Sequence, residues 1–286
     1  MFLKIDEKKK VDISIVIVTM NHLSKLTNLM PTIAKLKDDN FSFEVIIVDN
    51  CSSDGTVDFI QANYPEVTLK VNSKINGFAY NNNLGASISS GDYIFICNPD
   101  IILLDKSVEK MFYFAKHNPQ AGILCPQLLN SDLTYQQSIR NFHSLKIMFY
   151  RLLSMGDDST ENKIVKEYLL VNFNKKVTQT VDWAIGAAMF MKRQVYSELN
   201  GFDEKFFLYV EDEDLCLRAW QANYKVTYYP GAVMIHDHQR SSATKLNKLT
   251  WFHLKSFVYF VFKHNLIFKN LDRKGKQVNE SLFSLH

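Results

Sequence analysis

Three short apolar runs, each ending in polar residues, limit the folds open to this chain more than any other feature. They lie at residues 13–18, 43–48 and 93–97 and are rich in β-branched and aromatic side chains. Continuous apolar runs of this length are typical of strands that helices cover on both faces. Helix-like segments at residues 22–36 and 57–63 follow the first two runs. The alternation predicts right-handed βαβ units, a parallel sheet and an α/β fold.

The same pattern continues toward the centre of the chain. Residues 67–71 form another short strand-like run, and Asn76-Gly77 opens a helix-like segment that Gly91 closes before the run at 93–97. Open α/β sheets bind their ligands at the carboxyl ends of the strands. We therefore expect the polar residues that follow the runs to gather in one site.

Size and composition are those of an ordinary globular protein. The 286 residues are 47% hydrophobic and 22% charged, enough for one large α/β domain or two small ones. The net charge is only +3, but residues 245–276 contain eight Lys or Arg and a single acid. The basic charge is therefore a property of the tail. We predict no nucleic-acid partner.

No segment of the sequence resembles a signal peptide or a membrane span. The first ten residues lack an apolar core, and no apolar run reaches the length of a spanning helix. The cysteines show neither metal-ligand nor redox spacing, which is typical of a reduced cytosolic chain; they are Cys51, Cys97, Cys125 and Cys216. We expect a cytoplasmic protein whose membrane contact is peripheral.

The segment Asn98-Pro99-Asp100 directly follows the central apolar run. Pro99 fixes φ and cannot donate to a sheet, so the strand ends there and Asp100 stands at a stiff tip. A lone carboxylate in this position suits Mg²⁺ or Mn²⁺ held jointly with a substrate phosphate. The plain alternative is a strand-ending turn, because Asn, Pro and Asp are all common turn residues.

Polar residues that suit a nucleotide follow the first two runs. Thr19 and Asn21 come after the first run, and Asp49, Asn50 and Asp54 come after the second. The chain has neither a dinucleotide-binding glycine motif after its first run nor a P-loop, so side chains and a metal would hold the nucleotide. The alternative is that the second group forms only a turn and a helix cap.

Four consecutive acids, Glu211, Asp212, Glu213 and Asp214, precede an amphipathic helix-like segment. Acids in the first turn of a helix are stabilised by its macrodipole, and this structural role suits Glu213 and Asp214. Neighbouring carboxylates also repel one another, so a partly buried member has a raised pKa, as a general base requires.

His236 follows another strand-like run at residues 225–229, and His238 comes two residues later. A lone histidine is more often structural than a ligand, but the predicted site otherwise lacks nitrogen donors. The middle of the chain is less informative. We expect helices and a loop there that shape an acceptor site near Arg140 and His143.

In this order the motifs resemble those of inverting family-two glycosyltransferases with the GT-A fold, and they look closest to bacterial rhamnosyltransferases of O-antigen and cell-wall assembly. The motifs are Val18-Thr19-Met20-Asn21, Val48-Asp49-Asn50, Asn76-Gly77-Phe78 with Asn83, Asn98-Pro99-Asp100, Trp183 with Gly186, Gly201-Phe202-Asp203, Glu211 to Leu215, and His236. The resemblance covers residues 13–242, and residues 251–256 also look like the rhamnosyltransferase branch.

The resemblance implies a Rossmann-like, mostly parallel sheet flanked by helices, followed by a C-terminal helical extension. The GT-A domain would span residues 1–242. Its nucleotide-sugar half would occupy residues 11–105 and its acceptor half residues 106–242. A basic, aromatic-rich tail would occupy residues 243–286.

The resemblance also implies a role for each matching residue. Asp100 would bind the metal and the donor diphosphate, and Asn98 stands where the first acid of that motif is expected. The residues implied to hold the nucleotide sugar are Thr19, Asn21, Asp49, Asn50, Asn76, Gly77, Asn83, Asn98 and Asp100. Those implied on the acceptor side are Trp183, Gly186 and Glu211. Asp212 would be the catalytic base.

His236 would complete the metal site with Asp100. The family often shows a glycine-containing His-x-x-Gly-type segment after this histidine, whereas here Asp237-His238-Gln239-Arg240 follows. This departure leaves open whether His236 or His238 is the ligand.

The implied reaction is one in-line displacement. Asp212 removes the proton of an acceptor hydroxyl as that oxygen attacks the anomeric carbon, and Mg²⁺ or Mn²⁺ neutralises the leaving nucleotide diphosphate. The configuration inverts, so dTDP-β-L-rhamnose would give an α-L-rhamnoside. The implied acceptor is a polyprenyl-diphosphate-linked glycan of O-antigen or another cell-surface polysaccharide, met at the cytoplasmic face of the inner membrane.

Three other functions are open to such a chain. The first is transfer of glucose, galactose or GlcNAc from another nucleotide sugar. The second is a non-catalytic sugar-nucleotide-binding module, but the intact Glu211-Asp212 pair argues against it. The third is a nucleotidyltransferase. That class usually has a glycine-rich, basic phosphate loop after its first strand, and Thr19-Met20-Asn21-His22 is not one.

Residues 251–268 predict an amphipathic helix in the tail. A narrow polar stripe carries Lys255, Ser256, Tyr259 and Lys263, and the remaining surface is apolar. Such a helix suits an anionic membrane surface, where each nearby basic residue adds about 1 kcal/mol. The alternative is that the apolar surface packs on the catalytic domain or forms a homodimer.

Overall fold

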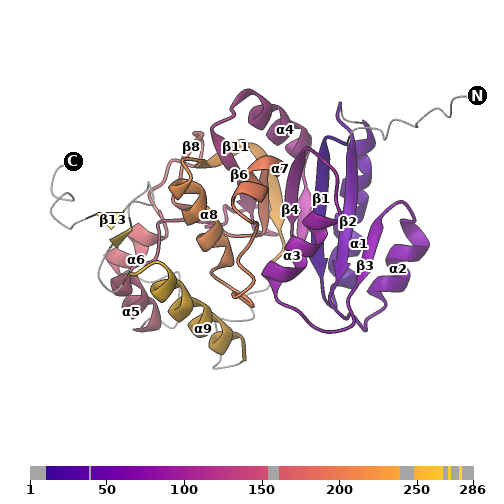
Figure 1. The fold of residues 1–286 in the computed structure, drawn as a ribbon. Helices are drawn as coiled ribbons and strands as arrows, with labels where there is room; N and C mark the ends of the chain where they lie inside the picture. Colours follow the sequence, from indigo (N-terminus) through magenta and orange to yellow (C-terminus); the bar gives the residue numbers. More distant parts are fainter. Residues whose placement is uncertain are drawn as a thin grey trace, which may run out of the picture.

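One nine-stranded sheet forms the centre of the protein, and helices pack on both of its faces (Figure 1). The computed structural model describes residues 11–38, 40–153, 161–238, 248–266, 270–271 and 277–278. Across the sheet the strands stand in the order β3 (Thr68–Val71), β2 (Phe43–Asp49), β1 (Ile13–Thr19), β4 (Tyr93–Cys97), β10 (Ala188–Lys192), β6 (Ala121–Leu129), β11 (Lys225–His236) and β5 (Ile101–Leu103), with β8 (Gln179–Thr180) also paired to β11.

The first half of the sheet has the parallel βαβ arrangement that the sequence predicts. Strands β3, β2, β1 and β4 are parallel to one another. Strand β10 is antiparallel to both β4 and β6, and β11 is parallel to β6. Because two reversals restore the direction, β1, β2, β4 and β11 all end at one edge of the sheet. The antiparallel strands β5 and β8 flank β11.

The two faces of the sheet belong to separate cores. Ile13, Ile15 and Ile17 of β1 are buried with α1 (Leu23–Ala34) and α4 (Ser107–His117), whereas Val16 is buried with α3 (Phe78–Ser87), α7 (Arg193–Glu198) and α8 (Glu211–Gln221). Burial on both faces explains why β1 is a continuous apolar run.

The remaining elements lie around this sheet. They are the 3₁₀ helix η1 (Lys35–Asp38), α2 (Thr56–Asn63), α5 (Leu145–Leu153), α6 (Lys163–Tyr168), α9 (Lys248–Lys263), and the two-stranded pairs β7 (Ile139–Arg140) with β9 (Trp183–Ala184) and β12 (Asn270–Leu271) with β13 (Gln277–Val278).

Strand β11 is longer than the apolar run at 225–229 indicates. Pro230 cannot donate to a sheet, and Pro-Gly normally ends a strand. Here the register shifts between Tyr229 and Val233, so a bulge absorbs the irregular residues and pairing resumes as far as His236. The bulge therefore allows one strand to carry His236 to the edge of the sheet.

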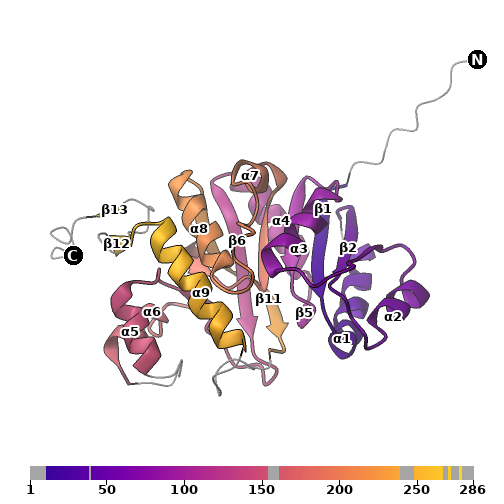
Figure 2. The ribbon, with the colours of Figure 1, turned by 60° about the horizontal axis from the view of Figure 1, so that its bottom comes forward.

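Helix α9 packs beside α8 (Figure 2). Phe257, Phe260 and Val261 are buried in the same core as α8. Part of the predicted polar stripe also points inward, because Ser256 Oγ donates to Leu208 O at 2.8 Å and Tyr259 OH donates to Asp203 at 2.9 Å. None of the helices in the described ranges combines the length and apolar character needed to cross a bilayer.

Candidate active site

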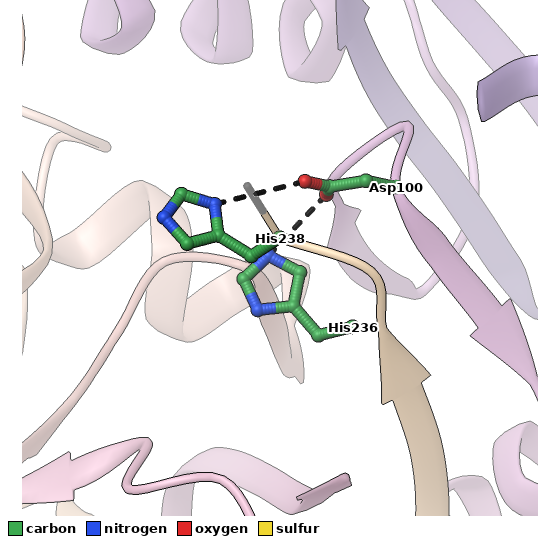
Figure 3. A group of neighbouring side chains, drawn as sticks. All are labelled: Asp100, His236 and His238. Carbon is green, nitrogen blue, oxygen red and sulfur yellow. Dashed lines mark ion pairs between the residues drawn. The ribbon is translucent and has the colours of Figure 1, made fainter. Parts of the chain in front are cut away.

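Asp100 and His236 meet at the edge where β4 and β11 end. Strand β5 pairs with β11 so that Ile101 lies opposite His236, and Asp237 N donates to Asp100 O at 2.9 Å. His236 Nε2 lies 3.3 Å from Asp100 Oδ1, and His238 Nδ1 lies 3.9 Å from Asp100 Oδ2 (Figure 3). The pairing of β5 with β11 thus brings together side chains that are far apart in the sequence.

A hydrogen bond at Nδ1, on the side of the ring away from Nε2, fixes the orientation of His236. Its Nδ1 lies 2.7 Å from Gln136 Oε1, and Gln136 is itself held because its Nε2 donates to Asn130 Oδ1 at 2.9 Å. An amide oxygen can only accept, so Nδ1 carries the proton. In the neutral ring Nε2 then presents its lone pair toward Asp100, which is the arrangement of a metal-ligating histidine.

Two buried atoms at this point lack a hydrogen-bond partner. Asp100 Oδ1 and His236 Nε2 are both inaccessible and unsatisfied, although they face each other. Burial alone would raise the pKa of Asp100, but the neighbouring imidazoles of His236 and His238 outweigh burial and hold that pKa well below its usual range. An ionised carboxylate and two imidazoles are a suitable donor set for a divalent cation.

The residues predicted to hold the nucleotide include Thr19 and Asp49, at the ends of β1 and β2. Thr19 and Asp49 are fully buried there, and Thr19 Oγ1 and Asp49 Oδ1 have no partner. The other oxygen of Asp49 accepts the N–H of Ser52 at 2.9 Å. Unsatisfied buried oxygens are costly, so these two are candidates for a ligand's hydroxyls.

Asn50 and Gly77 shape the loop before α3. Asn50 accepts the N–H of Asn76 at 2.9 Å and donates to Asn76 O at 3.0 Å. A side chain at Gly77 would clash, because its Cβ would stand 2.6 Å from Phe207 O. The Gly77 position therefore lets α3 approach the loop that leads into α8.

Asn21 and Asn83 have structural partners. Asn21 Oδ1 accepts the N–H of Ser53 at 2.8 Å, which joins the loops after β1 and β2. Asn83 accepts from Tyr196 OH and Phe202 N and donates to Phe202 O and Glu204. These four bonds use the whole capacity of the Asn83 amide. Asn83 therefore joins α3 to α7 and to the loop after α7, and its amide has no capacity left for a nucleoside.

The turn before α8 has an unusual backbone conformation. Tyr209 and Val210 have φ values of 70° and 71°, although neither is glycine. Such residues cost about 1–3 kcal/mol each and persist where surrounding contacts enforce them. Phe78 N donates to Phe207 O at 2.8 Å from one side, and Ser256 of α9 holds Leu208 from the other. The strain places the four acids at the start of α8.

Asp212 stands next to the metal side of the site. Its Oδ2 accepts the N–H of Gly186 at 2.8 Å, and its Oδ1 accepts the N–H of Glu213 at 2.8 Å. Residue Ala187, adjacent to Gly186, accepts the N–H of Asn98 at 2.9 Å. The Asp212 carboxylate and the Asn98–Asp100 segment therefore lie on adjoining stretches of backbone, although their sequence positions are far apart.

Burial raises the pKa of Asp212 above its usual range, although the N–H groups of Gly186 and Glu213 act in the opposite direction. Burial also raises the pKa of Glu211 well above its usual range, and the charge of Asp212 adds to this effect. Asp212 is partly exposed, whereas Glu211 is only 5% exposed and its Oε2 has no partner. Of this pair, Asp212 is the better placed to receive a proton from a substrate.

The other two acids of the cluster are tied to structural partners. Glu213 is fully buried and accepts from both the backbone N–H and the Nδ1 of His143. Asp214 is also fully buried and pairs with Arg218 of α8 and with Lys263 and His264 of the tail. Of these partners, only Arg218 could be inferred from the sequence, because it lies four residues after Asp214 on the same helix.

The residues predicted to line the acceptor side lie on or beside β9 and α8, close to β7. Trp183 is 6% exposed, and its indole N–H donates to Asn141 O at 2.8 Å. The Arg140 guanidinium lies 5.4 Å from the centre of the Trp183 ring. The centres of the His143 and Trp183 rings are 5.8 Å apart. Sequence reasoning pointed to Arg140 and His143 without assigning roles, and it missed Gln136.

Residues 14–196 match the protein family described as Glycosyl transferase family 2. Because this match covers more than half of the chain, the protein belongs to that family and is a glycosyltransferase. Residues 169–241 also match the family described as N-terminal domain of galactosyltransferase.

Two curated relatives are rhamnosyltransferases. The chain is 28% identical over 268 residues to rhamnosyltransferase WbbL of Escherichia coli, which covers 91% of this chain and 96% of WbbL. It is 25% identical over 233 residues to the N-acetylglucosaminyl-diphospho-decaprenol L-rhamnosyltransferase of Mycobacterium tuberculosis, covering 77% of this chain and 75% of the relative. The predicted resemblance to rhamnosyltransferases is confirmed.

Solved structures confirm the GT-A fold. GalNAc-T7, solved with UDP, GalNAc and Mn²⁺, has a TM-score of 0.66 at 14% identity and is matched over 90% of this chain but only 49% of its own. The chain thus spans about half of GalNAc-T7. Residues 1–349 of TarS from S. aureus have a TM-score of 0.54 at 14% identity, over 79% of this chain and 60% of that fragment. At these identities the likeness concerns the fold alone.

Proposed function

We propose that the protein transfers L-rhamnose from dTDP-β-L-rhamnose, with inversion, to a lipid-linked glycan in O-antigen or other cell-surface polysaccharide synthesis. The observation that carries the catalytic part is the convergence of Asp100, His236 and Asp212 at the edge where β1 and β2 end. The similarity to two rhamnosyltransferases supports the sugar, and one of their names supports a polyprenyl-diphosphate acceptor.

Asp100 and His236 fit a divalent cation, Mg²⁺ or Mn²⁺. Both offer an unsatisfied buried atom toward the same point, and Gln136 fixes the tautomer of the histidine. GalNAc-T7, which has a similar fold, was solved with Mn²⁺. When bound, the cation would neutralise charge on the leaving nucleotide diphosphate.

The chain's own residues perform the remaining chemistry. Thr19 and Asp49 hold the nucleoside, and Trp183 lines the acceptor side. Asp212 takes the proton of the acceptor hydroxyl while that oxygen attacks the anomeric carbon. The Gly186 N–H holds the carboxylate in a fixed position. Because attack and departure occur on opposite faces of the sugar, the product has inverted configuration.

Another hexose donor is the second candidate function. A fold does not determine which sugar is transferred, and GalNAc-T7 was solved with UDP and GalNAc. A non-catalytic binding module is a weaker candidate, because it has no need for a partly exposed Asp212 with a raised pKa.

A donor panel tests this proposal. The purified protein is incubated with a polyprenyl-diphosphate-linked GlcNAc acceptor, a divalent cation, and dTDP-rhamnose, UDP-glucose, UDP-galactose or UDP-GlcNAc, and release of nucleotide diphosphate is measured. We expect dTDP-rhamnose to give the largest acceptor-dependent release. A larger release from a UDP-hexose would move the assignment to that donor, and no release from any donor would favour the binding module.

We also propose that the protein is a peripheral protein of the cytoplasmic face of the inner membrane, attached through α9. The outer side of α9 carries an apolar row of Trp251, Leu254, Val258 and Phe262, which are 65%, 49%, 45% and 68% exposed. Their spacing places them along one face of the helix. The exposed Lys255 and the basic residues of the tail sequence supply charge for anionic lipid.

Vesicle cosedimentation tests the membrane contact. We expect salt-sensitive binding to vesicles rich in anionic lipid, and a loss of about tenfold or more when Trp251→Ser and Phe262→Ser are combined, because each exposed ring contributes about 1.5–3 kcal/mol on burial. Ile88→Ser, which changes an exposed apolar residue of another helix end, is the control. These substitutions test the membrane contact more specifically than truncation of the tail. Truncation would also remove Phe257 and Phe260, which are buried in the core.

The membrane proposal fails if the unaltered protein stays in the supernatant at low salt. It also fails if the double variant binds vesicles as tightly as the unaltered protein. Self-association through the same row, measured by sedimentation velocity without lipid, would instead identify the row as a homodimer interface.

A further inference from the structure

The sequence leaves open whether His236 or His238 is the metal ligand, and the structure places both beside Asp100. The side chains of Asp100, His236 and His238 lie together (Figure 3). Their possible ligand atoms are all within 4.8 Å of one another, so among the described residues these three form a group that could hold a metal ion. The two imidazole rings lie 5.1 Å apart and nearly parallel, at 22°. Residues two apart in an extended segment point to the same side, so His236 and His238 can both face Asp100.

The residue between the two histidines is held in place from three directions. Asp237 N donates to Asp100 O at 2.9 Å, and Ser131 Oγ donates to Asp237 Oδ1 at 2.6 Å. Lys25 of α1 donates to both Asp237 O, at 3.0 Å, and Asp237 Oδ2, at 2.5 Å. Asp237 therefore fixes the segment after β11, and its carboxylate is held by Lys25 and Ser131.

A neutral His236 ring does not satisfy the Asp100 carboxylate. His236 Nδ1 already donates to Gln136, so in the neutral ring Nε2 is an acceptor that faces the carboxylate oxygen of Asp100 at 3.3 Å. Two buried acceptors in contact need a shared proton or a cation between them. Both atoms lack a hydrogen-bond partner, which points to a cation as the missing group.

We propose that His238 is a third protein ligand, so that the chain binds one Mn²⁺ through one carboxylate and two imidazoles before any nucleotide is present. The proposal rests on the proposed function only in placing a cation at Asp100 and His236. Mg²⁺ prefers an all-oxygen shell and is bound through few protein carboxylates and substrate phosphates. Imidazole nitrogens suit transition metals. A site with two of them therefore selects Mn²⁺ over Mg²⁺.

Metal binding to the nucleotide-free, full-length protein tests this inference. Titration calorimetry with MnCl₂ and with MgCl₂, together with the electron paramagnetic resonance signal of free Mn²⁺, measures each affinity without donor, acceptor or turnover. We expect Mn²⁺ to bind at one site at least about tenfold more tightly than Mg²⁺. His238→Ala should weaken Mn²⁺ binding by about tenfold or more, since loss of even an outer-shell partner costs 10–100-fold.

His117→Ala provides the matched control. His117 is an exposed histidine of α4 whose ring contacts only Tyr113 O among the bonds described, and its removal should leave the Mn²⁺ affinity unchanged. His238 is itself largely exposed, so its loss should not unfold the protein, and circular dichroism checks this.

The two proposals can fail separately. If Asp100→Asn abolishes Mn²⁺ binding but His238→Ala binds Mn²⁺ as tightly as the unaltered protein, the predicted two-residue site stands and His238 is not a ligand. Equal affinity for Mg²⁺ and Mn²⁺ without nucleotide also overturns the inference. Failure of every sugar donor in the panel would leave these binding constants, and therefore this inference, unaffected.

Discussion

Replacing Asp100 by asparagine is expected to abolish sugar transfer while the fold survives. The carboxylate is the anionic donor of the cluster with His236 and His238, and an amide is a poor ligand for a hard cation. A bound cation supplies several kcal/mol of charge stabilisation in the transition state, and each 1.36 kcal/mol is a factor of ten in rate. The loss of kcat should therefore be about 10³-fold or more.

The measurement compares Asp100→Asn with Asp58→Asn, which makes the same chemical change at an exposed position near the start of α2. Steady-state rates are taken with saturating donor, with EDTA, and after addition of Mn²⁺ or Mg²⁺ in excess. The unaltered protein should lose activity in EDTA and regain it with metal, whereas Asp100→Asn should stay inactive in both. Full activity in EDTA, together with a nearly normal Asp100→Asn variant, would contradict metal-dependent transfer.

The sheet and its ligand-binding edge could be predicted because their signals are local. A β-branched run such as residues 13–18 indicates a buried strand wherever it occurs, and Pro99 ends a strand through its own covalent structure. Parallel βαβ connections then require these strands to end at one edge. The nearness of Thr19 and Asp49 follows from the chain order alone, and the strand register agrees.

The parts that could not be predicted depend on contacts between distant segments. Only the pairing of β5 with β11 places His236 opposite Ile101, and the bulge after Tyr229 that makes this possible leaves no local signature beyond Pro230 and Gly231. Asn83 shows the same dependence on distant contacts. Its type suits a nucleoside, and the sequence does not reveal that partners on α7 and on the loop after it use every donor and acceptor of the amide.

The tail helix has one buried and one exposed apolar face. Phe257 and Phe260 pack on the catalytic core, whereas Trp251 and Phe262 remain exposed. The spacing of apolar residues could not separate these two faces, because apolar residues cover most of the helix. Lys263 distinguishes them in the structure, since it pairs with Asp203 and Asp214 and so defines the inner face.

Replacing Asp212 by asparagine is expected to lower kcat by about 10²-fold or more, with little change in the KM for donor. Asparagine keeps the size of the side chain and can still accept the Gly186 N–H, but it cannot take a proton. Asp214→Asn should instead reduce stability, because it disrupts the buried pairs with Arg218 and Lys263. Thermal melts separate this structural loss from a loss of chemistry.

The pH profile gives an independent test of the same base. A base acts only when deprotonated, and burial raises the Asp212 pKa, so transfer should be present above that raised pKa and fall as pH drops through it. The acid limb should lie above pH 3.8, the ordinary value for this carboxyl, and should disappear from the residual activity of Asp212→Asn. Arg140 lowers the Asp212 pKa by its charge, so Arg140→Met should move the limb to higher pH.

If Asp212→Asn is nearly neutral and Glu211→Gln removes activity and the limb together, the base is Glu211, whose buried carboxyl has the more strongly raised pKa.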